Sequence, residues 1–555
     1  MESTARAAAS RTFSIEKSVT ASKADSSRGA KLLRGDWNIM KYPCVGIVAS
    51  AVLSLFLAHA SYALPTTHAV KVTGGAIVGS EDGPLNEYLG IPFAAPPLGD
   101  LRWRPPQPVV AWEGVRATRT FSPACAQTAT WVSNPKSEDC LYLNIWAPEK
   151  AKGLPVIVWI HGGAMDSGAA ALPVQNGANL AKRGAVVVTV NYRLGIFGFY
   201  ASPELSAESP EHVSGNQGIL DQIAALRWVR TNIAAFGGDP DRVTIMGNSS
   251  GGESVALLVA SPLAKGLFQR AIAESGNDAM PISPEDDHRF DPKSVAEAKG
   301  LAFAKAVGAE SLADLRKMSV EDLQKQAWLP RVYVDGYLLR SDLTTTYRDH
   351  RQNDVPLLVG WTAEEGKDLI GFYLDASAST SAGRRDQMAK LLGYPPSDRL
   401  LAAYPGATDA ETSASIEQLT NDWWGWRMAY WAALQAKYGR SKSYVYYFAH
   451  RPAEPPTACS WGCGAGHGVE IQYMLDNLAV DPRSWTAVDR RLADRLADTV
   501  IQFARTGRPA GDGLPAWPTF DGSKASILPI GNDAELQARP LPDLSLFPQV
   551  VDATK

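Results

Sequence analysis

Residues 243–255 read V-T-I-M-G-N-S-S-G-G-E-S-V, a strand-like run that meets a cluster of glycines and serines. Its first three residues favour a β-strand, and they run into the pattern G-x-S-x-G at 247–251, which is typical of a sharp strand-to-helix turn that carries a nucleophilic serine. Glycine suits such a turn, because the chain doubles back there and positive φ angles cost least without a Cβ atom. Ser249 is therefore expected to present its hydroxyl at a helix N-terminus, where free N–H groups and the helix dipole favour a developing oxyanion.

The pentapeptide alone is weak evidence for a catalytic turn, since Gly and Ser are common and such matches also occur in ordinary turns. The chain has 555 residues, of which 45% are hydrophobic and 20% charged, with a net charge of -4, an ordinary globular composition. No linker rich in Pro, Ser or like charges interrupts residues 64–555, so we expect a single domain over this range. The mild acidic balance, without a basic stripe, gives no electrostatic reason to expect nucleic-acid binding.

The first 63 residues differ from the rest of the chain. Residues 1–39 are rich in Ala, Ser, Lys and Arg without apolar periodicity, which indicates a disordered extension or an overcalled start. Residues 40–63 have the pattern of a secretory signal peptide: a lysine after Met40, an apolar run and small residues at a cleavage site after Ala63. A membrane anchor is the alternative, but the apolar run is shorter than the roughly 20 residues that a spanning helix needs. We therefore expect a secreted or periplasmic protein with no stable membrane anchor after signal cleavage.

The number of cysteines outside the signal segment is consistent with an exported protein. One of the five, Cys44, lies in the signal segment, which leaves Cys125, Cys140, Cys459 and Cys463 as an even set suited to an oxidising compartment.

Several ordered motifs carry a family resemblance from Leu64 to the C-terminus. They are L-G-I-P-F-A-A-P-P-L-G at 89–99, E-D-C-L-Y-L-N-I at 138–145, N-Y-R-L-G at 191–195 and F-G-G-D-P at 236–240, followed by the turn at Ser249. In this order they resemble the type B carboxylesterase and cholinesterase-like family. The resemblance implies an α/β-hydrolase fold, with a mostly parallel central sheet and helices on both faces.

The resemblance also implies a disulfide between Cys125 and Cys140. It would close a loop of about 15 residues, worth on the order of 3 kcal/mol in the chain-entropy model. By elimination Cys459 pairs with Cys463, the alternative being two free thiols. A metal site is not expected there, because the only nearby histidine, His467, has a catalytic use.

Apolar runs and helical periodicity fit that layering. Strands are expected to begin near Val156, Val186, Val243 and Leu357, and helices to cover 220–235 and 491–505, with a loop over 507–518. The alternation of strands and helices is typical of a parallel sheet covered on both sides.

The strand at 156–160 ends in His161-Gly162-Gly163-Ala164. In α/β-hydrolases the N–H groups of such a loop and of the residue after the nucleophile hold the oxyanion. The resemblance makes Gly163, Ala164 and Ser250 the donors. The family usually has a third Gly at Ala164, so the extra methyl group narrows the expected acyl pocket.

The acid and the base follow in the order Ser, acid, His that this fold uses. The family's acid precedes a Gly, which selects Glu365 over Glu364 in W-T-A-E-E-G. The stretch 464–471, G-A-G-H-G-V-E-I, resembles the family's histidine motif and makes His467 the base. The mechanism implied is attack by Ser249, loss of the alcohol and hydrolysis of an acyl-enzyme, without cofactor or metal.

Two departures from the family pattern bear on the substrate. Asn248 stands where the family generally has Glu, which removes a negative charge beside the nucleophile, disfavours a cationic substrate and makes an anionic one less costly. Ser250 replaces the usual Ala. Tryptophans at 422–426 and Trp461 either line the pocket or belong to the core, which is the commoner place for large aromatics.

The leading hypothesis is a secreted serine carboxylesterase that acts as a monomer or homodimer on a small-molecule ester. One alternative is an esterase specific for polycarboxylate esters, such as the tricarballylate esters of fumonisin-type mycotoxins that some secreted bacterial relatives cleave. Another is a non-catalytic cholinesterase-like binding protein, which the presence of Ser249, Glu365 and His467 disfavours. Acyl transfer to an alcohol uses the same residues and stays open.

Overall fold

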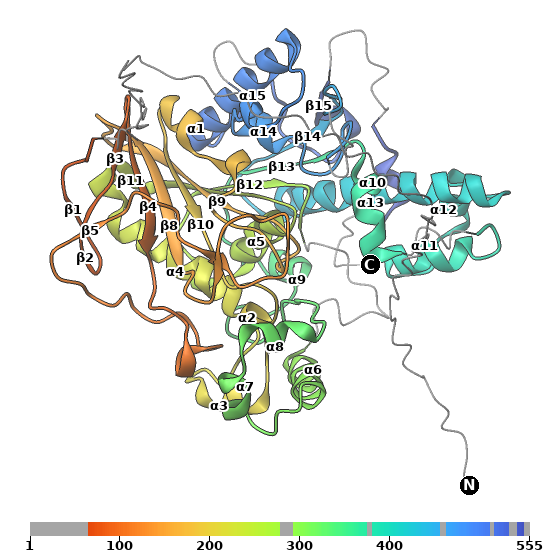
Figure 1. Ribbon diagram of the computed structural model, residues 1–555. Helices are drawn as coiled ribbons and strands as arrows, with labels where there is room; N and C mark the ends of the chain where they lie inside the picture. Colours follow the sequence, from red (N-terminus) through yellow and green to blue (C-terminus); the bar gives the residue numbers. More distant parts are fainter. Residues whose placement is uncertain are drawn as a thin grey trace, which may run out of the picture. The chain divides into compact units, whose positions relative to one another are not determined.

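A central sheet of buried strands organises the protein, described here from a computed structural model (Figure 1). The structure describes residues 65–277, 292–374, 380–455, 462–510, 516–531 and 541–548. Within these ranges the sheet has ten strands in the order β15-β14-β13-β12-β11-β9-β10-β8-β4-β3. Every neighbouring pair from β15 to β10 is parallel, and β8, β4 and β3 continue the sheet antiparallel. The predicted α/β-hydrolase architecture, a mostly parallel sheet between helices, is confirmed.

The strands of this sheet are β3 (Ser80–Asp82), β4 (Leu85–Pro92), β8 (Tyr142–Pro148), β9 (Leu154–Ile160), β10 (Val186–Val190), β11 (Gly238–Asn248), β12 (Arg270–Glu274), β13 (Leu357–Thr362), β14 (Ser443–Phe448) and β15 (Ile527–Ile530). Two small sheets lie beside it, made of β1 (Val70–Val72), β2 (Gly75–Val78) and β5 (Val115–Ala117), and of β6 (Ala124–Cys125) and β7 (Lys136–Ser137). The strands expected near Val156, Val186, Val243 and Leu357 are all present as β9, β10, β11 and β13.

The α-helices are α1 (Ala178–Lys182), α2 (Gly195–Phe199), α3 (Pro203–Glu208), α4 (Gln217–Asn232), α5 (Ser250–Ala260), α6 (Lys293–Ala306), α7 (Leu312–Lys317), α8 (Val320–Lys325), α9 (Leu343–Arg348), α10 (Glu365–Tyr373), α11 (Arg384–Leu392), α12 (Asp398–Ala403), α13 (Asp409–Tyr438), α14 (Ile471–Met474) and α15 (Ala487–Thr506). Helices α1, α14 and α15 lie on one side of the sheet, and α4 and α5 lie on the other (Figure 1).

Alternation along β9 shows why the sheet is covered on both faces. Val156, Val158 and Ile160 belong to the core that includes α4 and α5, whereas Ile157 and Trp159 belong to the core under α1 and α15. Successive side chains of a strand point to opposite faces, so a continuous apolar run needs an apolar layer on each side.

The predicted helices are confirmed, with extended boundaries. The run expected over 220–235 is α4 followed by the 3-10 turn Ile233–Phe236. The run expected over 491–505 begins four residues earlier, because Thr486 and Asp489 form a capping box at the start of α15. The helix ends at Gly507, whose φ of 74 places it in the left-handed region that glycine tolerates best.

The parallel strands bring distant parts of the chain to one edge of the sheet. Strands β9, β11, β12, β13 and β14 all end there, and the chain leaves them at Ile160, Asn248, Glu274, Thr362 and Phe448. Loops that follow the carboxyl ends of parallel strands commonly form the ligand site of such a sheet.

Several expectations lie outside the described residues: the extension at 1–39, the signal segment at 40–63, Cys459 and Trp461. Among the described helices, none combines the length and the apolar character that crossing a membrane requires.

Candidate active site

Ser249 lies in a strained turn between β11 and α5. Its φ and ψ angles are 57 and -127, a conformation that residues with a side chain rarely adopt. The neighbouring chain is close enough to require glycine: a Cβ atom on Gly251 would lie 2.2 Å from the carbonyl oxygen of Ile160. The turn therefore places Ser249 at the N-terminus of α5, beside the end of β9.

The loop after β9 runs next to this serine. A Cβ atom on Gly162 would lie 3.1 Å from the Cβ atom of Ser249, so the position admits little more than a hydrogen. Gly163 and Ala164 both have positive φ angles, 113 and 56. Within the described part of the chain, neither of their N–H groups donates a hydrogen bond to the protein. Both groups are thus available for an external acceptor.

Ser250 ties this loop to the turn. Its hydroxyl oxygen accepts a hydrogen bond from the N–H of Met165 over 3.1 Å, in a buried position. The sequence indicated only that Ser250 departs from the usual Ala and supplies a backbone donor. Its side chain holds the loop that carries Gly163 and Ala164.

His161 begins the loop as a buried neutral group. Its ring stacks on Tyr192 with centroids 4.5 Å apart, and the Tyr192 hydroxyl donates to its carbonyl oxygen over 2.9 Å. Burial lowers the pKa of His161 to about 4, against a small opposing effect of the Gly162 carbonyl. His161 therefore stays uncharged at neutral pH.

Glu365 and His467 are in direct contact, although 102 residues separate them in the chain. Nδ1 of His467 lies 2.5 Å from Oε2 of Glu365. The other oxygen of Glu365 accepts from the N–H of Thr362 over 2.8 Å and from the Ser275 hydroxyl over 2.5 Å. With three donors around it, the Glu365 carboxylate is fixed, and it holds Nδ1 of the imidazole.

The loop of His467 also packs against the residue before Ser249. Nδ2 of Asn248 donates to Oε1 of Glu470 over 3.3 Å, and a Cβ atom on Gly468 would lie 3.4 Å from Oδ1 of Asn248. The segment that carries His467 therefore lies against Asn248, the residue that precedes Ser249.

Acidic neighbours set the pKa of His467. Burial alone would lower that pKa, but the charge and hydrogen bond of Glu365, with further contributions from Glu470 and Asp368, raise it above its ordinary value. A raised pKa favours the protonated imidazole, which is the form a base takes after accepting a proton.

Comparison with known proteins decides the family. The family model described as "Carboxylesterase family" matches residues 66–542. The chain belongs to the carboxylesterase family. This agrees with the resemblance to type B carboxylesterases that the sequence motifs carry.

Curated members of the carboxylesterase family align over most of the chain. A fumonisin B1 esterase of Sphingopyxis macrogoltabida is 36% identical over 484 residues, covering 82% of this chain and 85% of the relative. A para-nitrobenzyl esterase of Bacillus subtilis (strain 168) is 34% identical over 502 residues, covering 85% of this chain and 97% of the relative. A solved PNB esterase structure has a TM-score of 0.70 at 34% identity and covers 82% of this chain and 94% of its own.

Two further buried carboxylates, Glu470 and Glu274, belong to the same cluster of charges as Glu365. Oε1 of Glu470 accepts from Ser275, 3.1 Å away, as well as from Asn248. Burial, then the charge of Glu365, raises the pKa of Glu470 to about 8, and burial together with Glu470 raises the pKa of Glu274 well above its usual range. Sequence reasoning missed these contacts; Glu470 stood within the histidine motif, but nothing in the motif indicated its partners.

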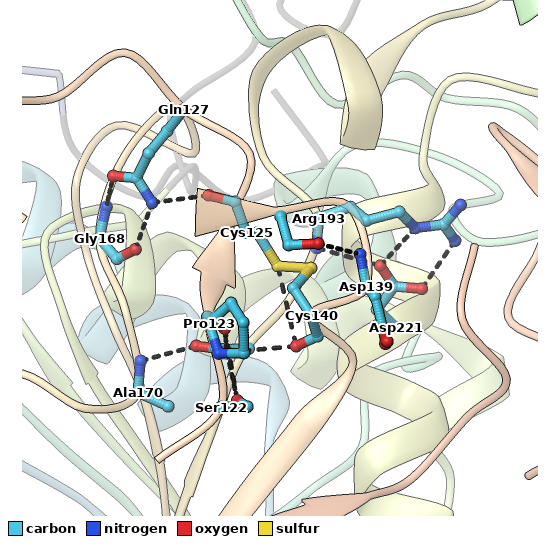
Figure 2. The surroundings of a disulfide bond; sticks show 12 residues. Ser122, Pro123, Cys125, Gln127, Asp139, Cys140, Gly168, Ala170, Arg193 and Asp221 are labelled. Carbon is cyan, nitrogen blue, oxygen red and sulfur yellow. Dashed lines mark hydrogen bonds and ion pairs between the residues drawn. A yellow bond between two sulfur atoms is a disulfide. The ribbon is translucent and has the colours of Figure 1, made fainter. Parts of the chain in front are cut away.

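The disulfide of this carboxylesterase-family chain supports the loop after β9. Cys125 and Cys140 are bonded, which confirms the predicted pair, and Figure 2 shows the surroundings. Gln127, two residues after Cys125, donates to the carbonyl oxygen of Gly168 over 2.7 Å and accepts from its N–H over 2.9 Å. The bridge thus anchors the segment that closes the loop of Gly163.

Cys463 is also disulfide-bonded, while its expected partner Cys459 lies outside the described residues. Among the described side chains, no group of three or more His, Cys, Asp or Glu residues is arranged to hold a metal ion.

The tryptophans expected at 422–426 lie on α13 and are buried. Trp424 contacts the imidazole of His467, with ring centroids 5.9 Å apart, so it borders the site. Trp426 instead stacks on Phe547 in the core. The guanidinium of Arg427 lies 4.6 Å from the centroid of the Trp424 ring, which brings a buried positive charge near the histidine.

Proposed function

We propose that the protein is a secreted serine carboxylesterase that hydrolyses carboxylic esters through an acyl-enzyme on Ser249. The observation that carries the proposal is the buried contact between His467 and Glu365. The segment of His467 packs against Asn248, and the next residue, Ser249, is held in a strained strand-to-helix turn. A nucleophile, a base and an acid that fixes the tautomer of the base are the parts that acyl transfer by serine requires.

The proposed reaction follows from these positions. Glu365 accepts the hydrogen on Nδ1 of His467, which leaves Nε2 as the basic nitrogen. Nε2 removes the proton of Ser249 as its oxygen attacks the ester carbonyl carbon. The protonated imidazole then gives that proton to the leaving alcohol. Water, activated by the same nitrogen, attacks the acyl carbon, and the acid leaves while Ser249 is reprotonated.

The tetrahedral intermediate needs hydrogen-bond donors. We assign this role to the N–H groups of Gly163, Ala164 and Ser250, since the first two donate to no protein acceptor in the described ranges and the third begins α5. Removing one such donor in other serine hydrolases costs about 10²-fold to 10³-fold in kcat.

The test is the initial rate of hydrolysis of small neutral aryl and alkyl esters by the disulfide-bonded protein, with Ser249→Ala as control. We expect a burst of one alcohol per protein followed by steady turnover, and loss of both in the variant. A protein that binds esters without cleaving them would support the binding-protein alternative. A product ester formed from an added alcohol, in preference to free acid, would support acyl transfer.

A second candidate is specificity for polycarboxylate esters, which four observations favour. Asn248 is neutral, and Glu470 beside it has a pKa raised to about 8 by burial and by Glu365, so the acid is mostly protonated at neutral pH. Arg427 brings a positive charge to the Trp424 ring, although Glu253 lies 3.8 Å from its guanidinium. The relative from Sphingopyxis macrogoltabida is named for fumonisin B1.

This candidate is tested by the ratio of kcat/KM for a tricarballylate ester to that for a neutral ester of the same alcohol. Asn248→Glu restores a negative charge beside the nucleophile and should lower the ratio by about tenfold, since one unfavourable charge contact costs on the order of 1 kcal/mol. Asn248→Gln is the neutral control and should leave this ratio of kcat/KM values unchanged. Equal ratios in all three proteins would rule this specificity out.

Secretion rests on the signal pattern at 40–63 and on the Cys125–Cys140 bridge, which suits an oxidising compartment. N-terminal sequencing of the exported product should begin at Leu64; a product that retains residues 40–63 would contradict it.

A further inference from the structure

His467 lies outside the helices and strands, yet its imidazole must be held in place. It belongs to a run of turns between β14 and α14. Hydrogen bonds and a single β-bridge, between Glu364 and Gly466, connect this run to the start of α10. The side chains that hold the backbone of this run therefore decide where the imidazole lies.

Asp368 holds two N–H groups of the histidine loop with one oxygen. Its Oδ2 accepts from the N–H of His467 over 2.8 Å and from that of Gly462 over 3.1 Å. The same oxygen would lie 2.6 Å from a Cβ atom on Gly466, so the loop wraps closely around the carboxylate.

Glu364 holds the middle of the same loop. Its Oε2 accepts from the N–H of Ala465 over 2.9 Å, and its own N–H donates to the Ala465 carbonyl oxygen over 2.9 Å. Its other oxygen accepts from the guanidinium of Arg451 over 3.0 Å. The side chain is 1% exposed, so these contacts replace its hydration.

The spacing of these two acids explains how they act together. Glu364 is the N-cap of α10, and Glu365 and Asp368 follow it in the first turn of the helix. Negative side chains are favoured at a helix N-terminus by the helix dipole. One helical turn thus presents three carboxylates to the histidine segment.

We infer that Glu364 and Asp368 are positioning residues that hold the loop 462–467, so that Glu365 can orient the imidazole of His467 toward Ser249. This inference rests on the proposed function, because it gives His467 the role of base. We name this pair the loop clamp. It differs from the triad acid, since its acceptors bind backbone N–H groups of the loop and not the imidazole ring.

Several charged groups surround His467, and the effect of Asp368 must be separated from theirs. Glu365 and Asp368 face it from α10, Glu470 from its own segment and Glu274 from β12 behind Glu470. On the other side, Arg427 lies over Trp424, whose ring contacts the imidazole. Apart from Asp368 itself, these groups are the same in every variant at position 364 or 368, so a difference between those variants belongs to the substituted position.

The experiment compares Asp368→Asn with Asp368→Ala. The amide keeps an oxygen that accepts the two N–H groups but removes the charge. It should keep kcat within about threefold at high pH and move the acidic limb of the kcat/KM profile down by about half a pH unit. The alanine variant removes the acceptor as well. It should lower kcat by about tenfold to a hundredfold with little change in KM, because a displaced base slows the chemical step.

Two substitutions at position 364 provide a second comparison of an amide variant with an alanine variant. Glu364→Gln keeps an acceptor for the N–H of Ala465 and should retain most of kcat, whereas Glu364→Ala should lower kcat as Asp368→Ala does. Asp386→Asn, an exposed acid on α11, is the charge control and should leave both the rate and the pH profile unchanged.

The outcomes are distinguishable. If both alanine variants keep the wild-type kcat and profile while Ser249→Ala is inactive, the loop clamp is overturned and the triad stands. If an alanine variant does not fold, the amide variants decide: both keep the acceptor oxygen, so a fall in kcat of tenfold or more at high pH in Asp368→Asn or Glu364→Gln overturns the loop clamp. If the wild type shows no hydrolysis that depends on Ser249, the proposed function fails and the loop clamp fails with it.

Discussion

Nδ1 of His467 lies 2.5 Å from Oε2 of Glu365, and the two side chains are 2% and 0% exposed. The opposite oxygen of Glu365 is held by the Thr362 N–H and the Ser275 hydroxyl. The acid therefore cannot turn away from the imidazole without losing buried hydrogen bonds, each worth about 1 kcal/mol or more. A fixed carboxylate at this distance should favour the tautomer of His467 with its hydrogen on Nδ1.

The first prediction concerns that tautomer. Glu365→Gln replaces the carboxylate by an amide, whose NH2 group can donate to Nδ1 and leave the proton on Nε2, where it cannot accept from Ser249. We expect kcat to fall by about 10⁴-fold with KM little changed, as for the acid-to-amide change in other triads. Steady-state rates with a chromogenic ester measure kcat and KM. A variant that keeps more than a tenth of the wild-type kcat would show that Glu365 is not the acid.

The sequence predicted the parts of this site that lie in local motifs. The strands at Val156 and Val243, the turn at Ser249 and the glycines around His467 each have a pattern within about ten residues. Their ends meet because parallel strands of one sheet finish at the same edge. The order of these motifs was therefore enough to predict the fold and to select Ser249, Glu365 and His467 as the candidate triad.

Local sequence patterns could not predict the contacts between segments that lie far apart in the chain. Ser275 contacts Glu365 across 90 residues and Glu470 across 195, and no local pattern marks such a pair. Helix α13 is buried around most of its surface, so its sequence does not distinguish Trp424, which borders His467, from Trp426, which packs in the core. Side-chain partners of this kind depend on packing that only the folded chain defines.

The second prediction concerns Ala164, which has a φ of 56 although it carries a Cβ atom. Ala164→Gly relieves a conformation that costs about 1 kcal/mol and removes the methyl group beside the expected acyl position. We expect kcat/KM for bulky acyl groups to rise several-fold relative to acetyl esters, with the stability of the protein kept. Initial rates on a series of acyl esters of one alcohol measure the effect.

A control variant shows whether a change in acyl preference or stability is specific to position 164 or follows from any Ala-to-Gly substitution. Ala207→Gly lies in α3 on the surface and should cost up to about 1 kcal/mol without changing the acyl preference. If Ala164→Gly lowers kcat/KM equally for all acyl esters, the methyl group of Ala164 does not limit the size of the acyl pocket.

The third prediction concerns the disulfide. Removing it in a Cys125→Ala, Cys140→Ala protein should lower the free energy of unfolding by about 3 kcal/mol, because the bridge closes a loop of 15 residues. It should also lower kcat, since Gln127 no longer anchors Gly168 at the end of the loop that carries Gly163 and Ala164. Urea unfolding and initial rates measure the two effects.

Substitution is the sharper test than a reductant, because Cys463 is disulfide-bonded as well. Ser122→Ala, next to the bridge in Figure 2, removes a neighbouring hydroxyl but leaves the bond and is the control. An unchanged urea midpoint in the double variant would refute the stabilising role of the bridge.

The fourth prediction concerns the pH dependence of stability at Glu470. Burial, then Glu365, raises its pKa from 4.5 to about 8, so the folded protein binds this proton more tightly than the unfolded chain does. The stabilising contribution of the bound proton is therefore complete below about pH 4.5 and is lost as the pH rises toward 8. Glu470→Gln cannot ionise, and its amide oxygen can still accept from Asn248 and Ser275.

We expect the unfolding free energy of the wild type to fall relative to that of Glu470→Gln between pH 5 and 8, by on the order of a few kcal/mol, and the difference to level off above that range. Urea unfolding at a series of pH values measures it. Asp386→Asn, exposed on α11, should give a curve parallel to that of the wild type over the same window. If the Glu470→Gln curve is also parallel, the buried acid is not protonated in the folded protein, and the pocket beside Asn248 carries a full negative charge that would oppose an anionic substrate.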